Sequence, residues 1–454
     1  MKEKEKTFTK KIGYISLGCD KNRVDTENVI TLLTKYGFVT EPDAAKADII
    51  IINTCAYLKE ARDEATSTIK EMLEYKKQKL EKLIVLGCYV QLDKNGLLRK
   101  PADGGGLAIT NLGEIAGIDA FVEPKDYDDL PEIIYGLYNK KFAAAEKLPD
   151  YRQITTPPHY AYLKIADGCS NYCAYCKIPY IKGEYKSIPI QDLTATAKTL
   201  AKQGVKELII VAQDITRYGL DLYKKPSLVR LLGELSKIEG IQWLRLLYCY
   251  PEMLDPLLVK EIAQNDKIVK YIDVPFQHVS TPLLKSMNRR GNEQSVRFII
   301  EFLRHQIPGI AIRTTFIVGF PGETKKDFRL LKRVLKEYKL ENVGFFTYSR
   351  EEGTPSYDLP KQISEKTKQK RLAKLQNIQQ KIALKNNMSI IGTEQKVLCD
   401  GYDAENELYY GRNYAMAPDV DFIIYFSGEN VKAGEFVSVK ITDATEEYLL
   451  GEKV

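Results

Sequence analysis

The sequence predicts an α/β protein built from three successive modules. Strand-like apolar runs alternate with amphipathic helical segments twice along the chain, over residues 12–86 and again over residues 161–348. Because each right-handed crossover returns the chain to the same edge of a sheet, such alternation favours parallel sheets. After residue 392 the pattern changes to short alternating segments separated by Gly, Asp and Pro, which predict a small antiparallel β-barrel.

Length and composition agree with this organisation. The chain has 454 residues, 44% of them hydrophobic and 28% charged, with a net charge of +6. At roughly 150 residues per domain, two or three domains are expected. No apolar run approaches the ~18 residues that span a bilayer, and the charged start MKEKEKTFTKK lacks the apolar core of a signal peptide. We therefore expect a cytoplasmic protein with no membrane contact, whose eight cysteines stay reduced and suit metal binding or catalysis.

The first module is predicted over residues 1–144, and its cysteines follow strand ends. Cys19, Cys55 and Cys88 each come directly after an expected strand. In a parallel sheet these ends share one edge, where ligands usually bind. Cysteines 36 and 33 residues apart can thus converge, although three unrelated buried cysteines remain the alternative. The expected strands are 12–19, 48–53 and 82–86, and the expected helices are 25–36 and 60–79.

Two segments are harder to assign, one within this module and one directly after it. Lys94 to Gly117 is rich in glycine and is interpreted as a loop or insertion, since it lacks the GxxxxGK[ST] pattern of a phosphate-binding loop. Residues 145–158 contain three prolines and are predicted to be a linker.

The second module, residues 159–360, contains six predicted strand–helix units. Six such units indicate an incomplete TIM-like (βα)6 barrel, whose active site is expected at the C-terminal ends of the strands. Residues 361–391 are predicted to form a connecting helix, and residues 392–454 the small β-barrel. The expected strands of the larger barrel are 161–166, 207–212, 243–248, 269–274, 310–318 and 343–348, with helices near 190–203, 227–238, 255–265, 292–306 and 324–338. Those of the small barrel are 396–399, 408–410, 421–426, 436–441 and 448–450.

The strongest chemical signal is a CxxxCxxC motif formed by Cys169, Cys173 and Cys176, within GCSNYCAYCKIPYIKG. Three closely spaced thiolates favour an iron–sulfur cluster or zinc. Structural zinc normally takes four protein ligands, and His159 stands ten residues upstream, before the strand. Three ligands leave one iron of a cubane open for a small molecule. Zinc and three unrelated structural cysteines remain the alternatives.

Polar and glycine residues stand at other strand ends of this barrel. Gly319, Pro321 and Gly322 lie in GFPGE after the fifth strand, where two glycines allow close backbone approach to a ligand. A plain strand–helix turn is the alternative. Other polar residues predicted to face the mouth are Gln213, Asp214, Gln277, His278, Ser349 and Arg350, with His278 equally suited to a structural role.

The CxxxCxΦC motif, with Tyr175 as the aromatic residue, resembles the radical S-adenosylmethionine superfamily. The resemblance implies that Cys169, Cys173 and Cys176 hold a [4Fe–4S] cluster, whose open iron binds S-adenosylmethionine and reductively cleaves it to a 5′-deoxyadenosyl radical. The residues then expected to bind the cofactor are Tyr175, Gly319, Pro321, Gly322, Gln277 and Asp214.

With the strand-end cysteines and the small C-terminal barrel added, residues 12–452 resemble the radical S-adenosylmethionine methylthiotransferases. The resemblance implies that Cys19, Cys55 and Cys88 hold an auxiliary [4Fe–4S] cluster carrying the sulfur, so that all six cysteines are catalytic. It also implies that the C-terminal module is a TRAM domain that recognises substrate. An external sulfur donor and an external electron donor are expected as partners.

The family has two substrate classes, adenosine in transfer RNA and an aspartate of small-subunit ribosomal protein twelve. The segments SLGCDKNRVDTE, IPYIKG, DVPFQH, RTTFIVGFPGET, TYSREEGT and GRNYAMAPDVD resemble the second class, which implies methylthio insertion at the aspartate β-carbon. The transfer-RNA enzyme is the alternative, together with a non-catalytic iron–sulfur factor that binds ribosomes or RNA.

The charge distribution favours the same choice. Residues 392–454 contain five Lys/Arg and thirteen Asp/Glu, a net charge of −8, which leaves +14 on the rest of the chain. A module that bound RNA is expected to be basic, whereas an acidic one attracts a basic ribosomal protein. RNA contact by this module is therefore not expected, and a merely solvated acidic surface is the alternative. The candidate contacts are Asp400, Asp403, Glu405, Glu407, Asp419 and Asp421.

Overall fold

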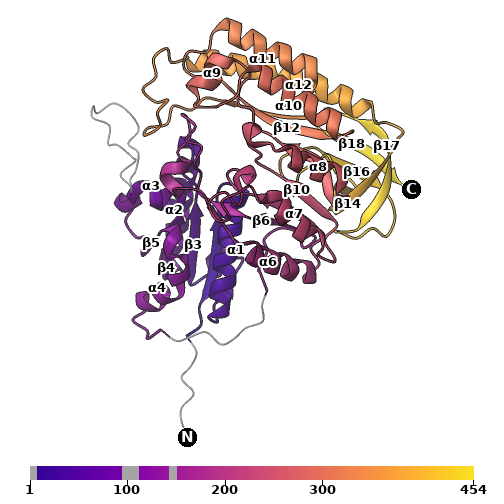
Figure 1. Ribbon diagram of the computed structural model, residues 1–454. Helices are drawn as coiled ribbons and strands as arrows, with labels where there is room; N and C mark the ends of the chain where they lie inside the picture. The colour runs from indigo at the N-terminus through magenta and orange to yellow at the C-terminus, as the bar shows by residue number, and fades with distance from the viewer. Residues whose placement is uncertain (1–7, 95–111, 143–150) are drawn as a thin grey trace.

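The computed structural model describes residues 8–94, 112–142 and 151–454. Figure 1 shows the N-terminal module at the lower left, the yellow C-terminal barrel at the right, and the larger barrel between and above them. The predicted fold class is confirmed. Most of the glycine-rich stretch predicted as an insertion, and residues 145–150 of the predicted linker, lie outside the described residues.

The N-terminal module is a five-stranded parallel sheet in the order β2-β1-β3-β4-β5. Its central strand β3 is buried on both faces, which explains its run of four isoleucines. Ile50 and Ile52 pack in one core, and Ile49 and Ile51 pack in the core on the opposite face. The strands are β1 Lys11–Ser16, β2 Val39–Thr40, β3 Ile49–Thr54, β4 Lys82–Gly87 and β5 Ala120–Val122. The helices are α1 Asp20–Lys35, α2 Lys59–Glu74, α3 Cys88–Lys94 and α4 Leu130–Leu137.

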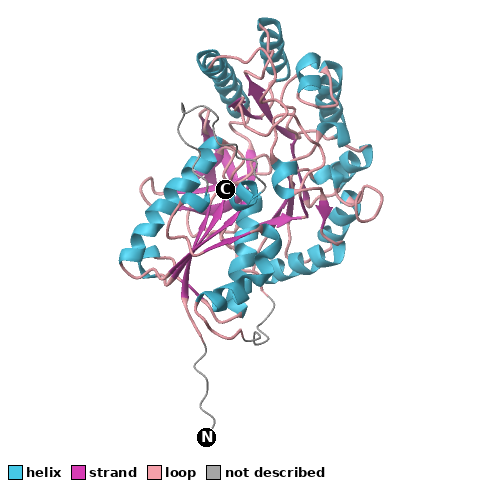
Figure 2. Cartoon of the chain, turned by 90° about the vertical axis from the view of Figure 1, so that its left-hand side faces the viewer, coloured by secondary structure: helices cyan, strands magenta, loops and turns pink. Residues whose placement is uncertain are grey.

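The second module is a six-stranded parallel sheet in the order β13-β12-β11-β10-β9-β6. Its two edge strands, β6 and β13, do not pair with each other within the described chain, so the barrel is incomplete. Figure 2 shows helices along the outside of the strands. The strands are β6 Tyr160–Lys164, β9 Glu207–Val211, β10 Trp243–Leu246, β11 Ile268–Asp273, β12 Ala311–Val318 and β13 Asn342–Thr347. The helices are α5 Ile178–Lys182, α6 Ile190–Lys202, α7 Leu228–Ser236, α8 Pro256–Gln264, α9 Thr281–Ser286, α10 Glu293–Gln306 and α11 Lys325–Tyr338, and β7 Ala166–Asp167 pairs with β8 Lys186–Ser187.

Alternation along β9 shows how the two faces of this sheet are used. Leu208 and Ile210 join the core formed with the outer helices, whereas Ile209 and Val211 belong to a second cluster on the other face. That second cluster includes Val24 from α1, and Leu398 and Ala417 from the C-terminal module. Both neighbouring modules therefore fill the inner face of the incomplete barrel.

The C-terminal module is a closed five-stranded barrel in the order β14-β15-β16-β18-β17, preceded by helix α12, Glu365–Met388. Its strands are β14 Glu394–Asp403, β15 Leu408–Arg412, β16 Ile423–Ser427, β17 Phe436–Ala444 and β18 Tyr448–Lys453. The pairing is antiparallel except between β16 and β18, which are parallel. This departs from the purely antiparallel expectation because β17 lies beyond β18, which returns beside β16.

A buried ionic network attaches this module to the larger barrel. Glu207 is fully buried and accepts from Arg245 Nε and Arg412 Nη1, each at 2.7 Å. Arg412 Nε also donates to Asp400 at 2.7 Å, and Asp400 Oδ1 lies 2.8 Å from His159 Nε2. Burial alone would raise the pKa of Glu207, but Arg412 and Arg245 outweigh it and lower that pKa.

Two of the predicted substrate contacts are therefore wrong. Asp400 belongs to this network, and Asp421 accepts from Tyr271 at 2.6 Å and from Arg313 at 3.3 Å. Counting charges did not reveal that Asp400 is paired with Arg412 of its own module and Asp421 with Arg313 of the larger barrel. In the part of the chain described, no helix is both long and apolar enough to cross a membrane.

Candidate active site between two cysteine groups

The strand-end group is formed by Cys19, Cys55 and Cys88. Because β1, β3 and β4 are neighbours in the sheet, the residues after their C-terminal ends lie along the same edge. Cys19 is the N-cap residue of α1, Cys55 follows β3, and Cys88 begins α3. We call these three residues the strand-end group.

Two glycines and one asparagine bring these segments close together. Gly18 has φ +92°, and a Cβ added there would lie 2.6 Å from the Cβ of Cys55. Gly87 has φ +103°, and its added Cβ would lie 2.3 Å from Asn53 Oδ1. Asn22 donates to the carbonyls of Leu17 and Thr54, each at 3.1 Å, and its Oδ1 lies 3.7 Å from Cys88 Sγ.

Burial and neighbouring thiols raise the pKa values of two of these cysteines. Burial raises the pKa of Cys88 to about 12; Lys182 opposes this, whereas Cys55 and Cys19 add to it. Burial also raises the pKa of Cys55, with a further contribution from Cys19. Three thiols gathered in this way become thiolates only if positive charge compensates them, as a metal centre does.

The second group, which we call the loop group, is Cys169, Cys173 and Cys176. These residues lie between β7 and α5 in the larger barrel. Arg289 Nη1 lies 3.9 Å from Cys173 Sγ, and the Ile178 amide lies 3.4 Å from Cys176 Sγ. Burial raises the pKa of Cys169 to about 11, to which Cys173 and Asp214 also contribute.

The predicted cofactor-binding residues have different local roles. Asp214 is buried and accepts from Asn171 Nδ2 at 2.8 Å and from the Thr216 amide at 3.0 Å, so it supports the loop that carries the cysteines. Gln277 has φ +67° and pairs with β12 through its own backbone. The partly buried Tyr175 has its pKa raised by burial and by nearby Cys173.

The GFPGE turn is held by buried charge. Glu323 accepts from Arg371 Nη1 at 2.6 Å and from the Gly319 amide. Gly319 has φ +76°, and a Cβ there would also lie 2.3 Å from Lys368 Cγ of α12, so both the backbone and this contact favour glycine. Gly322 has φ +83° with open space around it, and buried Pro321 lies between these glycines.

His278 is fully buried beside this turn. Its Nδ1 accepts from the Ser280 amide at 2.9 Å, and its Nε2 lies 3.7 Å from Glu323 Oε1. Complete burial favours the structural alternative for His278, but only Nδ1 is hydrogen-bonded, and Nε2 has no hydrogen-bond partner within the described chain.

Three family models match the three modules in chain order. Residues 11–104 match uncharacterized protein family UPF0004, residues 163–335 match the radical SAM superfamily, and residues 391–454 match the TRAM domain. The chain is 43% identical to ribosomal protein uS12 methylthiotransferase RimO of Acetivibrio thermocellus over 98% of both chains. It is 45% identical to the RimO of Thermoanaerobacter sp., covering 98% of this chain and 100% of that one.

This chain belongs to the RimO family of radical SAM methylthiotransferases. Among solved structures it resembles the radical S-adenosylmethionine methyltransferase TsrM of Kitasatospora setae, at a TM-score of 0.54 and 14% identity, over 77% of this chain and 75% of that chain. That likeness shows the fold alone. RimO-family membership implies S-adenosylmethionine and a [4Fe–4S] cluster as cofactors.

The residues present fit such a cofactor. Each cysteine group offers three thiols, the ligands of iron–sulfur clusters. No group of three His, Cys, Asp or Glu side chains among the described residues is close enough to hold a single metal ion, whereas a cubane is wider. Beside the loop group, the buried Arg289 Nε has no hydrogen-bond partner within the described chain and remains available to a bound group.

Several residues near the cysteines were not found from the sequence. Arg62, Lys177 and Glu351 form a buried ionic group between the two modules. Lys177 directly follows Cys176 and could have been noticed in the motif. Glu351 is 289 residues from Arg62, and no sequence pattern links two positions so far apart.

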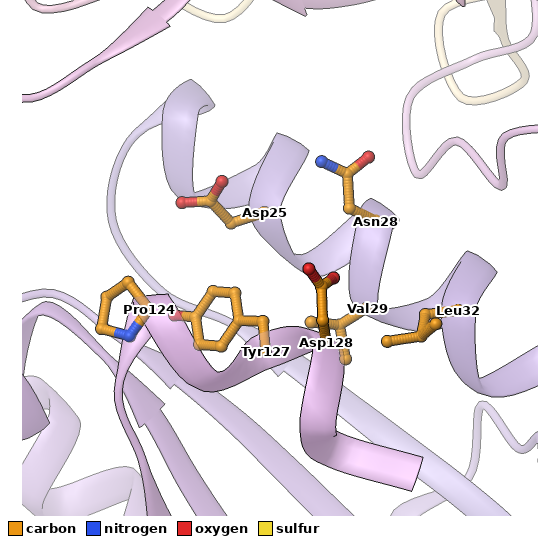
Figure 3. A pocket seen from close by; sticks show the side chains of 7 residues that line it. All are labelled: Asp25, Asn28, Val29, Leu32, Pro124, Tyr127 and Asp128. Carbon is orange, nitrogen blue, oxygen red and sulfur yellow. The ribbon is translucent and has the colours of Figure 1, made fainter. Parts of the chain in front are cut away.

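A separate cavity of about 190 Å³ opens between α1 and the short helix η4, Pro124–Asp129. Figure 3 shows side chains from these two elements around it. One of them, Asp25, also accepts from Lys182 at 3.1 Å and from Lys164. Its lining contains none of the cysteines or predicted cofactor-binding residues, so we do not include it in the candidate site. The lining residues are Asp25, Asn28, Val29, Leu32, Pro124, Tyr127 and Asp128.

Proposed function

We propose that this enzyme inserts a methylthio group at the β-carbon of an aspartate in ribosomal protein uS12. The observation that carries the proposal is the pair of three-cysteine groups. The strand-end group lies in the N-terminal module and the loop group in the larger barrel, and the short helix α5 connects them. The relatives at 43% and 45% identity that are named as uS12 methylthiotransferases support the substrate.

Each cysteine group is proposed to hold one [4Fe–4S] cluster through its three thiolates. When bound, the loop-group cluster with S-adenosylmethionine supplies a radical that removes hydrogen from carbon, and the strand-end cluster supplies the sulfur. Cys169 and Cys173 of the loop group are buried and Cys176 is partly buried, whereas the strand-end group includes the exposed Cys19. The loop group is thus better shielded from water, which protects such reactive species. An external sulfur donor and an external electron donor complete the proposed reaction.

The chain's own residues orient these groups. Asp214 supports the cysteine loop through Asn171, and Arg289 contributes a positive charge beside Cys173. The open space at Gly322 suits close approach of a ligand to the backbone. Tyr175, Gly319, Pro321, Gly322, Gln277 and Asp214 remain the proposed surroundings of S-adenosylmethionine.

The C-terminal module is proposed to attract the basic ribosomal protein. Glu405 and Glu407 are exposed in the β14–β15 turn, and Glu446 and Glu447 are exposed in the β17–β18 turn. A module with a net charge of −8 repels the phosphates of RNA. This favours uS12 over transfer RNA as substrate.

Iron counting and a substrate assay test this proposal. After anaerobic reconstitution we expect about eight irons per chain, four from each cluster. Changing Cys169, Cys173 and Cys176 together to Ala should leave about four, held by the strand-end group. With S-adenosylmethionine, reductant and sulfide, mass spectrometry should find the methylthio group on uS12. Modification of transfer RNA alone, or no 5′-deoxyadenosine at all, would exclude the proposal.

A further inference from the structure

Helix α5 connects the two cysteine groups. It begins two residues after Cys176, yet its Ile181 packs in the hydrophobic core of the N-terminal module together with Cys88 and Tyr89. Lys182, at its last position, donates to Asp25 of α1 at 3.1 Å. A helix that continues from the loop group is thus packed against the module that carries the strand-end group.

A single carboxylate completes this connection at the other end of α5. Glu351, which follows β13, is 2% exposed; its Oε2 accepts from Arg62 Nη1 at 2.9 Å and from Lys177 Nζ at 3.1 Å. Its Oε1 accepts from the Lys59 amide and from Ser349 Oγ, each at 2.8 Å. Both oxygens are therefore fully used by partners from three segments.

Each basic partner of Glu351 lies beside a different cysteine group. Lys177 directly follows Cys176 in the chain. Arg62 Nη1 also donates to the carbonyl of Ala56 at 3.2 Å, and Ala56 directly follows Cys55. Burial would raise the pKa of Glu351, but Arg62 and Lys177 outweigh it and lower that pKa, so the carboxylate stays charged.

We propose that Glu351 is a positioning residue that sets the spacing between the two cysteine groups. It acts through Arg62 on the segment after Cys55 and through Lys177 on the segment after Cys176. This inference rests on the proposed transfer between two clusters, because sulfur held at one group must meet a radical generated at the other. Small errors in such a spacing reduce the rate of transfer strongly.

The test compares Glu351→Gln with Glu341→Gln. Glutamine keeps the shape of Glu351 but removes its charge, which leaves Arg62 and Lys177 facing each other. Glu341 is a matched control before β13, where it accepts from Arg304 at 2.8 Å and from the Ile312 amide at 3.0 Å. Both of its partners belong to the larger barrel.

The first readout is hydrogen exchange of the chain without clusters. We expect Glu351→Gln to speed amide exchange in residues 178–182 and in the first turn of α2 together, while Glu341→Gln leaves both unchanged. Wild-type exchange in both segments of Glu351→Gln would overturn the inference. This readout does not depend on the number of clusters. An iron count of only four in the wild type would reject the two-cluster proposal, whereas the exchange result would still test the role of Glu351.

The second readout uses the reconstituted enzyme. Glu351→Gln should form 5′-deoxyadenosine at close to the wild-type rate, while methylthio transfer per 5′-deoxyadenosine falls about tenfold or more. The magnetic interaction between the two reduced clusters, measured by electron paramagnetic resonance, should change as well. A merely structural role would lower both activities in equal proportion with that interaction unchanged, and this result would overturn the inference.

Lys177→Met covers the case in which Glu351→Gln does not fold. This substitution keeps the Arg62–Glu351 ion pair, so the contact of Glu351 with the N-terminal module is retained. We expect faster exchange in residues 178–182 alone, together with a similar loss of transfer per 5′-deoxyadenosine. An unchanged transfer ratio in this variant would overturn the inference.

Discussion

The two cysteine groups differ in how the chain brings three thiols together. The loop group lies within eight consecutive residues, from Cys169 to Cys176, and its spacing can be recognised in any sequence. The strand-end group spans residues 19 to 88 and exists only because β1, β3 and β4 are neighbours. Spacing alone therefore reveals one group, whereas the other requires a prediction of the sheet.

The supports of the two groups differ in the same way. The strand-end group depends on the sheet itself, on Gly18 and Gly87, and on Asn22. The loop group depends on single side chains from distant loops, such as Asp214 and Arg289. We expect damage to the N-terminal sheet to affect the first group and to spare the second.

The largest expected effect separates the two groups by function. Cys55→Ala should retain the cleavage of S-adenosylmethionine and lose methylthio transfer completely, because only the strand-end cluster is lost. Cys173→Ala should lose both activities. Mass spectrometry of uS12 and chromatography of 5′-deoxyadenosine measure the two reactions.

Cys399→Ala is the matched control for these variants. Cys399 is buried in the core of the C-terminal barrel, outside both groups. It should keep all of the iron and both activities. Full methylthio transfer by Cys55→Ala would show that the two groups do not divide the reaction in this way.

The second prediction concerns the glycine before Cys88. Gly87→Ala places a Cβ at φ +103°, which costs about 1–3 kcal/mol for the backbone conformation alone, and the Cβ would lie 2.6 Å from the Thr54 carbonyl. We expect this variant to lose iron from the strand-end group while 5′-deoxyadenosine formation continues. Gly204→Ala is the control, because its φ of +98° carries a similar backbone cost while nothing lies within 4 Å of the added Cβ, and it should keep its iron. If Gly87→Ala keeps its full iron content, the strand-end group tolerates displacement of Cys88.

These glycines show what could be predicted from the sequence and what could not. Strand–helix alternation predicted the parallel sheets, and therefore the edge where Cys19, Cys55 and Cys88 gather. The close contact of Gly319 with Lys368 was not predictable, because Lys368 belongs to the distant helix α12.

Charged residues were the least predictable part of the site. The charge count correctly describes the C-terminal module as acidic, but Asp400 is paired with Arg412 of the same module and Asp421 with Arg313 of the larger barrel. Glu351, Arg62 and Lys177 lie in three separate parts of the chain. Ion pairs between modules leave no periodic pattern, because each needs only one residue at one point.

The third prediction tests whether the C-terminal module stabilises the larger barrel without stabilising the N-terminal sheet. In the wild type, the pKa values of Glu207 and Asp400 are lowered, so their contribution to stability is present above about pH 4.5 and is lost as the pH falls through the lowered values. Arg412→Met removes the positive charge that offsets the effect of burial on Glu207 and Asp400. The pKa values of both carboxylates should therefore rise, so both take up protons at higher pH. The melting temperature should therefore begin to fall at a higher pH than in the wild type.

The magnitude and the location of this effect can be checked together. Breaking a buried ion pair costs about 3–5 kcal/mol, whereas Arg297→Met breaks a more exposed pair with Glu337 and should cost about 1 kcal/mol or less. Hydrogen exchange at pH 5 should rise in the C-terminal barrel and in β9, but not in β3. An equal rise in β3 would mean that the N-terminal sheet also depends on this attachment.

The smallest expected effect concerns capture of the substrate, which should leave both cysteine groups unchanged. Glu405→Lys with Glu407→Lys reverses two exposed charges in the β14–β15 turn, far along the chain from any cluster ligand. Long-range attraction acts mainly on the association rate and is screened within ~8 Å at physiological salt. We expect association with uS12 to slow about two- to tenfold at low salt, with a weaker dependence on salt.

A double variant with the same change in charge, Glu71→Lys with Glu239→Lys, reverses exposed residues of the other two modules. Equal slowing by both double variants would mean that overall charge, and not the C-terminal module, attracts the ribosomal protein. Stopped-flow binding measures these rates, and unchanged uncoupled 5′-deoxyadenosine formation shows that the loop group is intact.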